Sequence, residues 1–194
     1  MTDSKGWLAE VQDRIAISEG CKATRYFDTL GVPTIGIGFS LQRGDAYSAL
    51  LKAGVAPTQV QGVIDGDVAL TQEQIAALFA YSFAPVISEA RSSLAPGIFD
   101  ALTDARRFVI CDLVYNLGYG GWLQFNRTRG MIADAQRAKQ TNAPNAHGYF
   151  VDAANDLRQS DWFNQVGWRA KRDCAMLEVG VYCSPTGDGS DILS

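Results

Sequence analysis

The sequence predicts an α+β protein that is mainly helical and has two unequal lobes. Three observations support this fold class. A first helical segment is followed by a short stretch rich in aromatic, β-branched and glycine residues, which is typical of a small antiparallel sheet. A single long helix comes next, and nearly every segment after it has helical periodicity.

The composition is that of a folded globular chain. Of the 194 residues, 47% are hydrophobic and 20% are charged, which supplies enough apolar side chains for a packed core. The 17 basic and 21 acidic residues leave a net charge of −4, and no basic block stands out. Because nucleic-acid-binding proteins carry a basic patch or stripe, we expect no nucleic-acid partner. We expect the protein to be a monomer.

The N-terminal segment carries charges every few residues and has no continuous apolar run. We therefore expect neither a secretory signal nor a membrane anchor. The four cysteines show no metal-binding spacing, and His147 is the only histidine, so we expect no zinc site. Cys111 and Cys174 lie in apolar helical stretches and are predicted to be buried thiols. A disulfide between Cys174 and Cys183 stays open at this stage.

The first lobe is predicted from its local patterns. Residues 5–19 have the spacing of an amphipathic helix, and Gly20 is expected to end it. Turn residues from Asp28 to Pro33, followed by a strand at Thr34–Gly38, predict a hairpin or small antiparallel sheet. A short helix at 45–53 is expected next, with loops from there to the long helix.

The long connecting helix is expected at about 71–93. Thr71 is a suitable N-cap, and Gln74 completes a capping box. Pro85 lies inside this segment, where it is expected to kink or interrupt the helix.

The second half is predicted to be helical, with a loop at 140–148 and a loose tail at 184–194. The predicted helices are 98–103, 104–118, 125–139, 149–159 and 167–180. We predict one domain, 1–183, made of an N-terminal lobe at about 20–70, the connecting helix, and a C-terminal lobe at about 96–183 that also includes helix 5–19.

Two carboxyl groups and a threonine stand out in the region of the predicted sheet. Glycoside hydrolysis requires a protonated carboxylic acid and a second carboxylate on opposite sides of the bond. Glu19 ends the first helix, where the negative end of the helix dipole favours its protonated form. Asp28 follows nine residues later in a turn, and Thr34 six residues after that, where its hydroxyl can hold a water. On residue types alone, the non-catalytic interpretation is favoured, in which Glu19 is a helix-end surface charge and Asp28 forms the turn.

In Glu19-Gly20, Tyr26, Asp28, Gly31 and Thr34–Gly38, the chain resembles glycoside hydrolase family 24, the phage-type lysozymes, which keep the same intervals between Glu, Asp and Thr. The resemblance extends along the chain. Leu70–Phe79 is similar to the family's helix that joins the lobes. The central helix of the bundle and the loop after it are matched by Ala105–Arg107, Tyr115–Gly118 and Phe125. The family's C-terminal signature is matched by Ser160–Gln165 and Arg169–Arg172.

The resemblance implies a lysozyme-like fold and a muramidase that needs no metal or cofactor. The substrate would be bacterial peptidoglycan, cleaved with inversion at the β-1,4 bond between N-acetylmuramic acid and N-acetylglucosamine. Glu19 would protonate the leaving oxygen, while Asp28 and Thr34 would position the attacking water. Arg169 matches the family arginine that supports the catalytic acid. Positions matched to sugar contacts are Gly38, Tyr115, Asn116, Thr128 and Ser160.

Two departures from the family pattern occur together. Phe39 stands where a histidine is common, and Ser82 stands where its acidic partner would be, which indicates a lost surface ion pair. Trp162 is expected to pack in the interior rather than bind sugar.

The expected role is that of a phage endolysin, made in the host cytoplasm and acting on peptidoglycan in the periplasm. Without a signal segment the protein would need a holin, a virion or a secretion apparatus to reach its substrate. A virion-associated lysozyme, a secreted antibacterial effector, a related glycanase acting on chitin or chitosan, and a non-catalytic wall-binding module all stay open.

Overall fold

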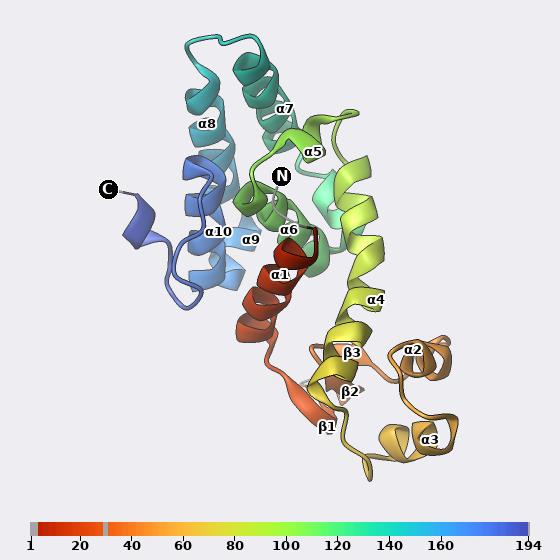
Figure 1. Ribbon diagram of the computed structural model, residues 1–194. Helices are drawn as coiled ribbons and strands as arrows, with labels where there is room; N and C mark the ends of the chain where they lie inside the picture. Colours follow the sequence, from red (N-terminus) through yellow and green to blue (C-terminus); the bar gives the residue numbers. More distant parts are fainter. Residues whose placement is uncertain (1–3, 29–30, 194) are drawn as a thin grey trace. The chain divides into compact units, whose positions relative to one another are not determined.

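The computed structural model describes residues 4–28 and 31–193, and the chain divides into two compact units, Met1–Pro85 and Val86–Ser194. The predicted α+β class is confirmed. The elements in Figure 1 are α1 (Ser4–Glu19), β1 (Lys22–Phe27), β2 (Pro33–Gly36), β3 (Phe39–Ser40), α2 (Ala46–Lys52), α3 (Pro57–Asp65), α4 (Gln72–Ser92), α5 (Ile98–Ala101), α6 (Asp104–Leu123), α7 (Asn126–Gln140), α8 (Ala146–Arg158), α9 (Asp161–Val166), α10 (Trp168–Val179) and the 3-10 turn η1 (Ser190–Ile192).

The first unit contains a three-stranded antiparallel sheet in the order β1-β2-β3. Tyr26 in β1 lies opposite Thr34 in β2, and Thr34 lies opposite Ser40 in β3. Directly opposed residues share a face of the sheet, so these three side chains form one polar row. Ile35 and Phe39 also oppose each other, and both are buried on the other face.

The second strand is shorter than the sequence predicts. It ends at Gly36, where a φ of 62° turns the chain, and Gly38, with a φ of 71°, lies in the turn before β3. The alternation of small and apolar residues suggested a continuous strand to Gly38. The left-handed backbone at these two glycines makes a tight turn instead.

The end of α1 and the start of α4 agree with their sequence signals. Gly20 ends α1 with a φ of 83°, and its N–H donates to the Ala16 carbonyl at 2.8 Å. The predicted capping box of α4 is present: the Thr71 N–H donates to Gln74 Oε1 at 2.9 Å, and the Gln74 N–H donates to Thr71 Oγ1 at 3.2 Å. Of the kink or interruption expected at Pro85, the interruption does not occur, because the 21-residue α4 includes Pro85.

Two helices were not predicted. α3 occupies residues expected to be loops, although Pro57 in its first turn and Gly66 with a φ of 89° are recognisable start and stop signals. α9 begins after Ser160, whose hydroxyl accepts the N–H of the residue three positions on. α6 was predicted to end at Gly118. Helical structure continues to Leu123, but Gly118 itself is not helical, with φ 70° and ψ 158°.

The second unit is a bundle in which α8 packs against both α7 and α10. Cys111 and Cys174 are fully buried as predicted, and no disulfide joins Cys174 to Cys183. In the tail, η1 contacts α10; how mobile the tail is stays a prediction. No helix within residues 4–28 and 31–193 combines the length and the apolar character needed to span a membrane.

Arg106 ties α6 to the end of α10. Its Nε donates to the Leu177 carbonyl at 2.8 Å, and its Nη2 donates to the Glu178 carbonyl at 2.8 Å. These bonds satisfy carbonyls that a helix end otherwise leaves without partners. The guanidinium also lies 3.4 Å from the centroid of the Phe150 ring. Burial lowers the pKa of Arg106 to about 10, so the group stays charged at neutral pH.

The Arg106 contact predicts a large effect of Gly180→Ala. Gly180 has a φ of 83°, and an added Cβ would lie 2.7 Å from the Arg106 Cζ. We expect a loss of at least about 2 kcal/mol in the free energy of unfolding, measured by urea denaturation. Gly130→Ala is the control, because Gly130 lies in α7 and its added Cβ has open space. This control should gain about 0.5–1 kcal/mol. Equal stability of the two variants would contradict the role of Arg106.

Candidate active site

The three predicted catalytic residues all lie in the first unit, on neighbouring elements. Glu19 is the last residue of α1 and is exposed. Asp28 directly follows β1, and Thr34 lies in β2 with 4% of its surface exposed. Only Gly20 and Cys21 separate α1 from β1, so Glu19 is held close to the start of the sheet.

The main chain of Val32 fixes both Asp28 and Thr34. The Val32 N–H donates to Asp28 Oδ1 at 2.8 Å, and the Asp28 N–H donates to the Val32 carbonyl at 3.0 Å. Thr34 Oγ1 donates to the same carbonyl at 3.0 Å. Because the Thr34 hydroxyl hydrogen is used in this bond, its oxygen can act only as an acceptor toward a further ligand.

The pKa of Tyr26 depends on the two predicted catalytic carboxyl groups. Its pKa is raised by partial burial and, in addition, by the negative charges of Asp28 and Glu19. Charges act on one another in this way mainly within about 10 Å. Both predicted catalytic carboxyl groups therefore lie within electrostatic range of one phenol.

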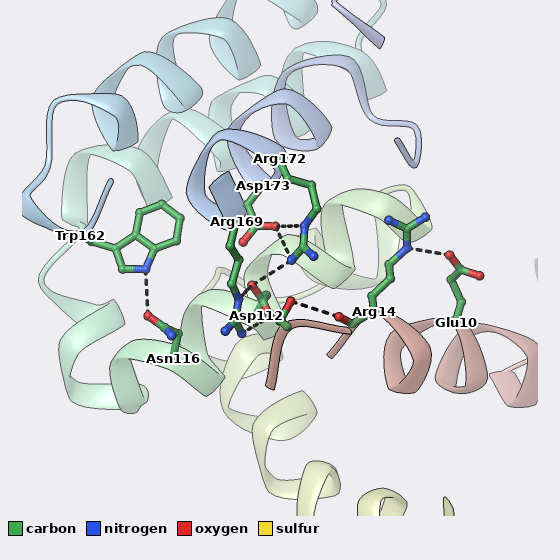
Figure 2. Close-up of polar contacts among 9 residues, drawn as sticks. Glu10, Arg14, Asp112, Asn116, Trp162, Arg169, Arg172 and Asp173 are labelled. Carbon is green, nitrogen blue, oxygen red and sulfur yellow. Dashed lines mark hydrogen bonds and ion pairs between the residues drawn. The ribbon is translucent and has the colours of Figure 1, made fainter. Parts of the chain in front are cut away.

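Arg169, the predicted support of the acid, belongs to a buried charge cluster of the second unit. Its Nε and Nη2 donate to the two oxygens of Asp112 at 2.8 and 2.6 Å. Arg172 lies beside them, with its Nη2 3.5 Å from Asp112 Oδ2 and its Nε 3.0 Å from Asp173 Oδ1. Figure 2 shows these four side chains converging between α6 and α10. That Arg169 supports Glu19 stays a prediction.

The two carboxyl groups of this cluster have different protonation states. Burial raises the pKa of Asp173 well above its ordinary value, and the charge of Asp112 acts in the same direction. Burial opposes ionisation of Asp112 too, but the hydrogen bonds and charge of Arg169 hold the pKa of Asp112 below its ordinary value. Asp173 is thus the protonated member of the cluster, beside the negatively charged Asp112.

Three of the predicted sugar contacts lie at or near the surface. Gly38 is exposed in the turn between β2 and β3 of the first unit. In the second unit, Tyr115 is half-buried and Asn116 is exposed. The Asn116 Oδ1 accepts the indole N–H of Trp162 at 3.0 Å, as Figure 2 shows, and Trp162 is buried as expected.

The other two predicted contacts lie at a pocket of the second unit. Thr128 is fully buried, and its hydroxyl donates to Asp156 Oδ2 at 2.6 Å, so Asp156 rather than Thr128 faces the pocket. Arg127 lies across from it, 3.7 Å from the Asp156 carboxylate. The pocket has a volume of about 450 Å³ and is lined by Gln124, Phe125, Asn126, Arg127, Asp156, Gln159 and Ser160.

Asp112, Asp156 and Arg127 were not singled out from the sequence. Asp112 does carry a signal, because a charged residue within the apolar helical run 108–114 implies a buried partner. Asp156 and Arg127 have no such signal.

Comparison with known proteins places the chain in a family. The family model for phage lysozyme matches residues 16–159. The pre-baseplate central spike protein of Enterobacteria phage T4 is 25% identical over 166 residues, which span 84% of this chain and 26% of the spike protein. Probable T4-type lysozyme 1 of Dictyostelium discoideum is 24% identical over 178 residues, spanning 90% of this chain and 96% of that protein. Probable T4-type lysozyme 2 of the same organism is 22% identical over 177 residues.

The fold, the carboxyl pair and these matches define a glycoside hydrolase of the lysozyme class. More narrowly, the chain belongs to the phage lysozyme family.

The protonated Asp173 predicts a pH-dependent effect of Asp173→Asn. A carboxyl group whose pKa is raised by folding stabilises the fold fully below its unfolded pKa, about 3.9, and loses this contribution as pH rises toward its folded pKa. The amide does not ionise, so the variant should become increasingly more stable than wild type as pH rises from 4 to 7. Thermal unfolding across this range measures the difference, and parallel curves would contradict the assignment.

Asp112→Asn is the opposing variant. It leaves two buried guanidinium groups without their carboxylate, so we expect a loss of about 3 kcal/mol or more at pH 7. Asp100→Asn, which removes an exposed partner of Arg91, is the surface control and should change stability by less than about 1 kcal/mol.

Proposed function

We propose that the protein is a muramidase that hydrolyses the β-1,4 bond between N-acetylmuramic acid and N-acetylglucosamine in peptidoglycan, with inversion. The observation that carries this proposal is that the main chain of Val32 holds both Asp28 and Thr34 by hydrogen bonds. Beside them lies Tyr26, whose pKa is raised by the charges of Asp28 and Glu19 as well as by burial. A carboxyl group at a helix end and a second one in a hairpin turn supply the two groups that inversion requires.

In the proposed mechanism, Glu19 gives its proton to the glycosidic oxygen as the bond from this oxygen to the anomeric carbon breaks. A water attacks the anomeric carbon from the opposite face, and Asp28 takes one hydrogen of that water as a proton. The bond between Asp28 and the Val32 N–H keeps the carboxylate in one orientation while it acts.

Thr34 would hold the second hydrogen of the attacking water. Its own hydroxyl hydrogen is donated to the Val32 carbonyl, so its oxygen presents lone pairs toward the water. A water whose two hydrogens are accepted by Asp28 and Thr34 directs an oxygen lone pair at the sugar. Holding the water in this position lowers the activation barrier, because less entropy is lost on reaching the transition state than when a free water attacks.

We assign the pocket around Asp156 and Arg127 to glycan binding. It combines amide, hydroxyl and charged groups with one aromatic residue, Phe125. A few convergent polar groups beside an apolar surface are typical of sites for small polar ligands.

The first prediction concerns the acid. Glu19→Gln removes the proton donor but keeps the shape of the side chain, so kcat/KM for release of reducing ends from purified peptidoglycan should fall by a factor of about 10²–10⁴. Asp13→Asn on the same helix is the matched control, since Asp13 is exposed to solvent. It should retain activity within about twofold. Full activity in Glu19→Gln, with the fold intact by circular dichroism, would refute the mechanism.

The second prediction concerns stereochemistry and substrate. NMR of freshly cleaved oligosaccharides should show the α-anomer of the new reducing end first, because inversion converts a β-glycoside into an α-product. Initial formation of the β-anomer would exclude the water-attack scheme. Chitosan oligomers cleaved faster than peptidoglycan would favour the alternative glycanase. Binding of peptidoglycan without any new reducing ends would favour a wall-binding module.

We further propose that the biological role is that of a phage endolysin, made in the host cytoplasm and released to the periplasm. The likeness to the phage T4 spike protein favours a second role, a virion-associated lysozyme. Mass spectrometry of purified particles separates the two, since an endolysin is absent from the virion and a virion-associated lysozyme is a stoichiometric component.

A further inference from the structure

The polar row on the sheet contains one tyrosine, Tyr26. Tyr26 is half-buried and lies opposite Thr34, two positions before Asp28. The ammonium group of Lys22 lies 4.6 Å from the centroid of its ring, which restrains the ring from one side. Within residues 4–28 and 31–193, no side chain or main-chain group hydrogen-bonds to the Tyr26 hydroxyl, so this donor is available to a ligand.

We propose that Tyr26 is a substrate-contacting residue whose hydroxyl donates a hydrogen bond to a sugar oxygen held between Glu19 and Asp28. The proposal rests on the proposed function, because it assumes that a glycan occupies this position. It adds a hydrogen-bond donor that takes no part in the proton transfers.

Chemical complementarity supports this role. Toward a ligand, Asp28 offers carboxylate oxygen and Thr34 offers the lone pairs of its hydroxyl, so both act as acceptors. The proton of Glu19 is consumed in the reaction. A sugar oxygen at this place needs a further donor, and Tyr26, which lies opposite Thr34 on the same face of the sheet, can supply it through its hydroxyl. Its ring also offers an apolar surface to the sugar.

The charges around Tyr26 keep it in the donor form. Partial burial, together with the negative charges of Asp28 and Glu19, raises the pKa of Tyr26 above its ordinary value. The phenol therefore retains its hydrogen at neutral and mildly alkaline pH.

Tyr26→Phe tests the proposal, because it removes only the hydroxyl. We expect kcat/KM on peptidoglycan to fall roughly tenfold, the loss of one hydrogen bond to substrate, while the unfolding temperature stays unchanged. Tyr81→Phe is the matched control. The Tyr81 hydroxyl donates to Asp45 at 3.1 Å, so this variant should lose stability and keep wild-type kcat/KM.

The outcomes separate this role from the proposed function. Wild-type kcat/KM in Tyr26→Phe would overturn the contact, and so would a loss of activity that matches a large fall in unfolding temperature. Binding of a peptidoglycan oligosaccharide is measured in parallel in the Glu19→Gln background, with and without Tyr26→Phe. Should wild type fail to hydrolyse peptidoglycan while Tyr26→Phe still weakens this binding, the contact stands and the proposed function fails.

Discussion

The main chain of one residue, Val32, holds the groups on which the proposed chemistry depends. It fixes the carboxylate of Asp28 through its N–H and the hydroxyl of Thr34 through its carbonyl. The register of the sheet maintains this arrangement, because a slip by one residue would move Thr34 to the opposite face. The same slip would expose Ile35 and Phe39, which are buried on that face, at a cost of about 2 kcal/mol each. Packing of the apolar face therefore determines where the polar face puts its reactive groups.

The second unit places its own constraint on Arg169. Its guanidinium is held by both oxygens of Asp112, and Arg172 links this pair to Asp173. With Asp173 protonated, the cluster contains two positive groups and one negative group. Buried ion pairs of this kind add little net stability compared with apolar packing, but removing one partner is costly. The four side chains therefore restrict one another, and Arg169 has little freedom to change its orientation.

Features with a local cause were predictable from the sequence, and features with a distant cause were not. The end of α1 at Gly20 and the capping box at Thr71 follow from residues within one helical turn. α3 was missed although its start and stop signals are local, because a short helix between loops has little periodicity. The pairing of Asp112 with Arg169 joins residues 57 positions apart, and that of Thr128 with Asp156 joins residues 28 apart. No local pattern specifies such partners.

The same distinction explains how a chain of low sequence identity to its relatives could keep the proposed catalytic site. All the groups assigned to the reaction lie between Glu19 and Thr34, and three of the bonds that orient them involve the main chain of Val32. Main-chain bonds place no demand on side-chain identity beyond a compatible turn and register. The remaining positions need only preserve the apolar or polar character of each face, which many sequences can do. Few positions are therefore fixed in identity, while many are fixed only in polarity. This explains why the chain matches the family model over residues 16–159 although its identity to the relatives is only 22–25%.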